Sequence, residues 1–119
     1  MHVNQLPDDI FQALEEWSGC IISLPLRVLL SRTNGAAIGD LVRLYAPAEL
    51  LERNETYETR EYCPGWLTIG DDSGGSAIVV APEKWPMPVY LVGHGSMSRA
   101  DFVEIAEDLD EWVRSGCKL

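Results

Sequence analysis

The stretch Pro-Gly-Trp-Leu-Thr-Ile-Gly-Asp-Asp-Ser-Gly-Gly-Ser-Ala-Ile-Val-Val, residues 64–80, decides the fold. Two short apolar runs within it, 66–69 and 77–80, contain the β-branched and aromatic residues that favour strands. The segment 70–75 between them combines glycines, which adopt positive φ freely, with aspartates, which hydrogen-bond their own backbone. The pattern therefore predicts a β-hairpin that turns at 70–75.

Further strands are predicted on both sides of this hairpin. The apolar run 89–92 follows the proline-rich connection 82–88 and predicts the next strand of an antiparallel meander. Upstream, Leu-Val-Arg-Leu-Tyr at 41–45 has the composition of another strand. We expect a central, mostly antiparallel sheet.

Helices are predicted before and within this sheet. Carboxylates after Pro7 are typical of a helix N-terminus, and the apolar face of that helix contains Ile10, Leu14 and Trp17. A second helix runs from Leu24-Pro25 to Asn34-Gly35, and we expect these two helices to pack as a hairpin. A short helix follows Pro47, and the polar run 54–61 is interpreted as a surface helix or loop.

The last predicted helix begins at Ser98, where Asp101 three residues later forms a capping-box pattern. Apolar residues then recur at helical spacing, and Gly116 ends the helix. These apolar residues are Phe102, Ile105, Ala106, Leu109, Trp112 and Val113, and the opposite face has the carboxylates Glu104, Glu107, Asp108 and Glu111. A sheet flanked by N-terminal helices and a C-terminal helix belongs to the α+β class.

Composition limits the class of protein. The chain has 119 residues, 46% of them hydrophobic, which predicts one self-folding domain over residues 1–119. Nineteen Asp and Glu against nine Lys and Arg give a formal charge of -10, the wrong sign for binding phosphate backbones. The apolar runs are too short for a membrane span, and 1–7 lacks the basic start of a secretory signal. We expect a cytoplasmic protein that binds neither nucleic acid nor membranes.

Three cysteines, an odd number without CxxC spacing, predict free thiols rather than disulfides or a zinc site. Cys20 and Cys63 are interpreted as small core residues, and Cys117 is placed in a frayed tail. Adjacent Asp71 and Asp72 are possible metal ligands, but the further acidic ligands of an EF-hand loop are missing, which favours a turn. No metal or cofactor site is predicted.

One enzymatic hypothesis stays open. His94, between two glycines, is a candidate general base for Cys63 or Ser96. No GxSxG-like nucleophile motif accompanies these residues, so the favoured interpretation of His94 is an ordinary loop histidine without a catalytic role.

Two features indicate protein binding instead. Trp17 and Trp112 lie on apolar helical stripes and are expected in the core, whereas Trp85 lies in a connection and is the candidate exposed anchor. The predicted acidic helix face suggests a basic protein partner.

In order and spacing, several of these segments resemble the SMI/KNR family of the SUKH superfamily. The resemblance is carried by Leu24-Pro25, Asn34-Gly35, the 66–75 segment Trp-Leu-Thr-Ile-Gly-Asp-Asp-Ser-Gly-Gly and the Phe102 segment. Ser76 stands where the family often has an acidic residue, and Ala36 where a further glycine often follows Asn-Gly. The resemblance implies an α+β domain without known catalytic residues. Bacterial members are mostly thought to be immunity proteins that neutralise toxins, many of them nucleases, and a yeast relative is associated with cell-wall regulation.

Together these observations lead to the hypothesis of a non-enzymatic immunity protein that binds a toxin directly, with a nuclease as the candidate toxin class. Its candidate contacts are Asp71, Asp72, Trp85, Glu104, Glu107, Asp108 and Glu111. A cytoplasmic adaptor with a regulatory or cell-envelope partner and the small Cys/Ser-His hydrolase are the two alternatives. Oligomeric state is left open.

Overall fold

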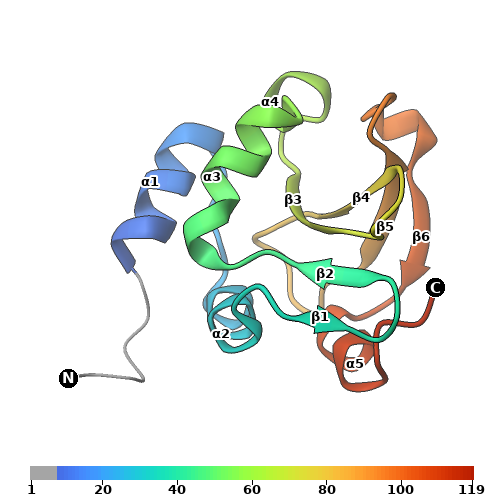
Figure 1. The fold of residues 1–119 in the computed structure, drawn as a ribbon. Coiled ribbons are helices and arrows are strands. Elements are labelled where there is room, and N and C mark those ends of the chain that lie inside the picture. Colours follow the sequence, from blue (N-terminus) through green and yellow to red (C-terminus); the bar gives the residue numbers. More distant parts are fainter. Residues whose placement is uncertain (1–7) are drawn as a thin grey trace.

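A computed structural model describes residues 8–119, and its centre is a curled antiparallel sheet of six strands (Figure 1). Each strand pairs with its neighbour in the sequence, so the sheet is a meander. The strands are β1 (Ala37–Ile38), β2 (Val42–Leu44), β3 (Leu67–Asp71), β4 (Ser76–Val80), β5 (Val89–Gly93) and β6 (Val103–Ala106). The predicted α+β class and the four predicted strands are confirmed. The two-residue β1 was not predicted, because a strand so short shows no alternation.

The predicted hairpin at 70–75 is confirmed. Asp72 Oδ1 accepts hydrogen bonds from the backbone N–H groups of Gly74 (2.9 Å) and Ser76 (3.1 Å). Gly70 is required at the end of β3, because a Cβ there would overlap the carbonyl oxygen of Arg43 on β2. The side-chain hydrogen bonds of Asp72 therefore fix the turn, and the close approach of β2 requires a glycine at its first residue.

The helices and one face of the sheet enclose the main core (Figure 1). Within residues 8–119 the helices are α1 (Asp8–Ser18), α2 (Leu24–Thr33), α3 (Pro47–Thr56), α4 (Thr59–Tyr62) and α5 (Leu109–Arg114). The core combines Phe11 and Leu14 of α1 and Leu30 of α2 with Ile78 of β4 and Trp112 of α5. The prediction that Trp112 lies in the core is confirmed.

The packing of α1 differs from the prediction. Phe11 is buried, whereas Ile10 is 36% exposed and Trp17 is half-buried beneath the guanidinium of Arg60. The predicted hairpin of the first two helices is wrong, because α1 lies alongside α3. Neighbouring helix residues lie about 100° apart around the axis, so burial of Phe11 in place of Ile10 is a change of face by one residue. Apolar periodicity alone does not determine which helix packs against that face.

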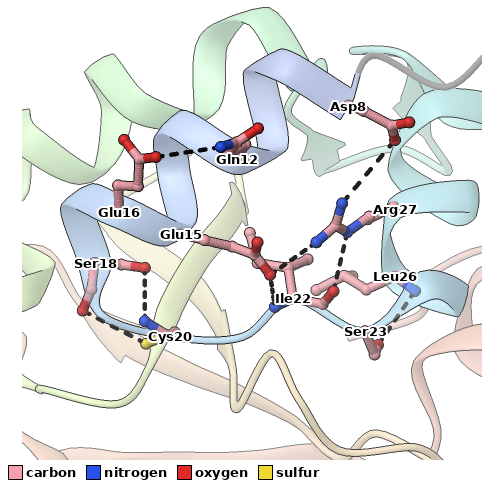
Figure 2. Close-up of polar contacts among 10 residues, drawn as sticks. All are labelled: Asp8, Gln12, Glu15, Glu16, Ser18, Cys20, Ile22, Ser23, Leu26 and Arg27. Atoms are coloured by element: carbon pink, nitrogen blue, oxygen red, sulfur yellow. Dashed lines mark hydrogen bonds and ion pairs between the residues drawn. The ribbon is translucent and has the colours of Figure 1, made fainter.

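A polar junction joins α1 to α2 instead (Figure 2). Glu15 Oε2 accepts hydrogen bonds from Arg27 Nη2 and from the backbone N–H of Ile22, both at 2.7 Å. Arg27 Nε also donates to the carbonyl oxygen of Ile22 at 3.0 Å. Ser23 begins α2 by accepting from the N–H of Leu26 at 3.4 Å, as the side chain at a helix N-cap does.

The segment 54–61 is mostly helical and its charged residues Glu55, Glu58, Arg60 and Glu61 are exposed, as predicted, but two of its polar residues are not. α3 continues to Thr56 and α4 follows it, and both Asn54 and Thr59 are fully buried. The Asn54 side chain bonds both backbone polar groups of Thr68 on β3. The Thr59 hydroxyl pairs with the Thr68 hydroxyl at 3.0 Å. Polar composition is therefore misleading only at Asn54 and Thr59, which find their hydrogen-bond partners on β3.

The prediction of one long C-terminal helix from Ser98 is wrong. Ser98 caps only a 3-10 helix, η1 (Arg99–Asp101), after which the chain extends through Phe102 into β6. α5 begins at Leu109, with Asp108 as its N-cap. The sequence Val-Glu-Ile-Ala suits either structure, and pairing with β5 decides for the strand because backbone ladder bonds outweigh weak helix propensity.

The tail is also better ordered than predicted. Cys117 is 4% exposed rather than part of a frayed end, and the Trp112 indole donates to the carbonyl oxygen of Lys118 at 2.8 Å. Cys63 is buried as expected, whereas Cys20 is only partly buried. Burial raises the pKa of the Cys63 and Cys117 thiols to about 11.

Candidate protein-binding surface

The four candidate carboxylates of the C-terminal segment do not form one helix face. Glu104 lies on β6, Glu107 precedes α5, Asp108 caps α5, and Glu111 is on its first turn. The structure nevertheless brings three of them together, because Glu107, Asp108 and Glu111 line one shallow hollow beside Trp112 and Ser115. Asp108 Oδ1 accepts from the N–H of Asp110 at 3.1 Å, so this carboxylate also holds the start of α5.

Glu104 adjoins this acidic hollow along the chain. Its carboxylate lies near the hydroxyl of Tyr90, which is opposite it on β5. The pKa of Tyr90 is raised, mainly by burial and to a smaller extent by the hydrogen bond to Glu104. Six carboxylates and no basic residue occur between positions 101 and 111, which makes this the most acidic segment of the chain: Asp101, Glu104, Glu107, Asp108, Asp110 and Glu111.

Trp85 lies in a different hollow. Its side chain is 40% exposed and shares a shallow, largely apolar depression with Leu24 and Val28 of α2. Asp110 and Arg114 of α5, which form an ion pair, border the same depression. Trp85 and the acidic hollow therefore lie on two sides of α5.

Asp71 and Asp72 lie at the other end of the strands. The register pairs Ser76 with Gly93 near the hairpin, whereas Val89 pairs with Ala106 next to the acidic hollow. Both aspartates are engaged within the chain. Asp71 Oδ2 accepts from the hydroxyl of Tyr45 at 2.8 Å, and its Oδ1 accepts from the N–H of Ser73 at 2.9 Å.

The residues of the hydrolase hypothesis do not form a hydrogen-bonded pair. Ser96 donates to Asp101, and the raised pKa of Cys63 keeps it a neutral thiol. The His94 ring instead stacks on Tyr57, with centroids 4.3 Å apart, and its Nε2 is buried without a hydrogen bond to the described residues.

An aromatic cluster that the sequence analysis missed covers the second face of the sheet. Trp66, Tyr90 and Phe102 meet edge to face or tilted, with centroid separations of 5.0–5.9 Å. The exposed Arg99 guanidinium lies 5.0–5.7 Å from all three ring centroids. Because these residues come from three separate segments, no local spacing signals the cluster.

The described residues also limit the chemistry and the membrane contacts of residues 8–119. No group of three or more His, Cys, Asp and Glu side chains in this range is arranged to hold a metal ion. Among the described helices, none has the length and apolar character needed to cross a bilayer.

The comparisons with known proteins agree with this architecture. No protein with a curated function matches the chain. The model of the SMI1 / KNR4 family (SUKH-1) matches residues 5–115, which is nearly the whole sequence. The chain therefore belongs to the SMI1/KNR4 family (SUKH-1).

Proposed function

We propose that this protein is a cytoplasmic, non-enzymatic immunity protein that neutralises a basic toxin domain by direct binding. The observation that carries the proposal is its membership of the SMI1/KNR4 (SUKH-1) family together with a formal charge of -10. Three free cysteines fit a reducing compartment. A nuclease is a suitable toxin class, because its active site must attract a polyanion and is therefore basic.

The candidate contact surface is the acidic hollow of Glu107, Asp108 and Glu111, with Glu104 on the adjoining strand. Its carboxylates complement a basic surface and would steer the encounter by long-range attraction. Trp85, on the other side of α5, is a candidate aromatic anchor at the margin of the same interface. Asp71 and Asp72 remain candidates at the opposite end of the sheet, where their hydrogen bonds keep the hairpin rigid.

The structure favours binding over the hydrolase alternative. A cysteine nucleophile must be a thiolate, and burial raises the pKa of Cys63 to about 11. A serine nucleophile needs a neighbouring base, and Ser96 donates to Asp101 rather than to His94.

The test begins with a tagged pull-down from the host and mass spectrometry of the proteins retained. Co-expression of a retained basic toxin domain should be lethal alone and harmless with this protein. A retained partner without toxicity would instead support the adaptor alternative, and the immunity proposal would then be abandoned.

Electrostatic steering is tested on the same complex. We expect the association rate to fall at least about tenfold from low salt to about 0.5 M salt. The triple variant Glu104→Gln, Glu107→Gln and Glu111→Gln should reduce the rate at low salt. The matched control replaces the exposed glutamates Glu16, Glu52 and Glu55 by Gln, which changes the net charge equally. Equal effects of the two triple variants would remove the acidic hollow from the interface.

A further inference from the structure

Within residues 8–119, no further strand pairs with one margin of the sheet. β6 is the last strand in the sheet order, and Figure 1 shows it on the right, next to β5. Apart from the ladder with β5, Val103–Ala106 makes no backbone hydrogen bond to another residue of 8–119. No side chain in that range bonds this backbone either. Alternate N–H and C=O groups of such an edge point outward, where they can pair with another strand.

The other margin of the sheet, formed by β1, is less suited to pairing with an added strand. β1 has two residues, too few for a stable ladder. The C-terminal tail also packs directly against Gly39, the residue that follows β1. A Cβ on Gly39 would overlap the carbonyl oxygen of Gly116. β6 is twice as long, and its first two residues are exposed.

The side chains of β6 indicate what kind of strand fits. Val103 is 60% exposed and Glu104, the one charged residue of β6, is exposed next to it, whereas Ile105 and Ala106 are half-buried. A second copy of this chain would bring two copies of the acidic segment 101–111 close together, and the repulsion between them is unfavourable. A strand that alternates basic and apolar residues would place its cations near Glu104 and, beyond the strand, near Glu107 and Glu111.

We propose that the outer edge of β6 takes up an extended, basic segment of the partner protein as a seventh strand of the sheet. The inference deepens the proposed function, on which the basic character of the partner rests. Backbone hydrogen bonds would supply the part of the affinity that does not depend on the partner's sequence. The carboxylates would select a basic segment over a neutral or acidic one.

The probe for this edge is a fluorescent octapeptide of alternating lysine and valine, added to the full chain. We expect binding by anisotropy together with slowed amide hydrogen exchange at 103–106. The control peptide has the same sequence with methyl groups on its four central backbone nitrogens, which keeps the charge but removes the ladder donors. It should bind at least about tenfold more weakly. Equal binding of the two peptides, or no slowing at 103–106, would overturn the proposal.

A pair of double variants separates this proposal from the immunity function. Val103→Lys with Glu104→Lys makes the edge basic, and the control Leu41→Lys with Glu52→Lys changes the net charge equally at exposed positions elsewhere. Only the edge variant should lose peptide binding and protection against the toxin. If both variants protect cells as the unmodified chain does, the edge proposal fails and the immunity function stands. If no toxin is neutralised but the peptide still pairs with β6, the immunity function fails and the edge proposal stands.

Discussion

Asn54 acts in place of a strand beside β3, and replacing it should be among the most damaging single changes in the chain. β2 pairs with β3 only at Gly70 and Asp71, so the same edge of β3 has no strand at Thr68. Asn54 Nδ2 donates to the Thr68 carbonyl at 2.9 Å, and the Thr68 N–H donates to Asn54 Oδ1 at 2.8 Å. Both residues have no exposed surface, so water cannot replace either bond without entering the core.

The magnitude follows from the groups left without partners. Asn54→Ala leaves the N–H and C=O of Thr68 buried and unpaired, and each such group costs about 1–3 kcal/mol. The free energy of unfolding should therefore fall by about 2–6 kcal/mol, a large share of the roughly 5–15 kcal/mol of an ordinary domain. With a urea m-value of about 2 kcal/mol per molar, a loss of about 4 kcal/mol lowers the midpoint by about 2 M.

Urea unfolding followed by circular dichroism measures this loss, and hydrogen exchange reports the Thr68 amide directly. The control is Glu52→Ala on the exposed side of α3, which should change stability by no more than about 0.5 kcal/mol. A loss below about 1 kcal/mol for Asn54→Ala, with the Thr68 amide still protected, would refute the reasoning.

Three further results are expected. Hydrogen bonds from Arg43 lower the pKa of Glu49 to about 2 from its ordinary 4.5, so their stabilisation is present above about pH 4.5 and is lost as pH falls toward 2. Glu49→Gln should cost at most about 1 kcal/mol at pH 7, because the pair is partly exposed, and should cost nothing by urea unfolding near pH 2; an equal cost at both pH values would contradict this. Iodoacetamide at pH 8 should label partly exposed Cys20 in the native chain and spare Cys63, as peptide mass spectrometry would show; rapid labelling of Cys63 would contradict its burial. Arg99→Ala should lower stability by about 1 kcal/mol in urea unfolding through lost cation–π contacts, and Arg99→Lys should retain part of it; no loss for the alanine variant would argue against the stacking.

Where local chemistry acts alone, the sequence predicts the structure well. The glycines and aspartates of 70–75 specify their turn through backbone freedom and short-range hydrogen bonds, and the flanking strands follow. The candidate site is predicted less well. Glu107, Asp108 and Glu111 do gather, but through the end of β6 and the cap of α5 rather than on one continuous helix.

Long-range partners explain the failures. The apolar spacing from Phe102 to Val113 fits a helix, but β5 presents an open edge that Val103–Ala106 completes. The polar residues Asn54 and Thr59 look solvated in the sequence and are buried. Asn54 bonds the Thr68 backbone where β2 does not pair with it, and the Thr59 hydroxyl pairs with the Thr68 hydroxyl.

The sequence by itself determined the family, the α+β class, the meander around the 70–75 turn and the net charge, since these depend on neighbouring residues and composition. Only the tertiary structure decided that α1 lies beside α3, that the segment after Phe102 is a strand, and that β6 is the last strand of the sheet within residues 8–119. Each of these outcomes depends on which strand edge or apolar surface, distant in the sequence, lies next to the segment in the folded chain. Local sequence patterns do not specify that neighbour.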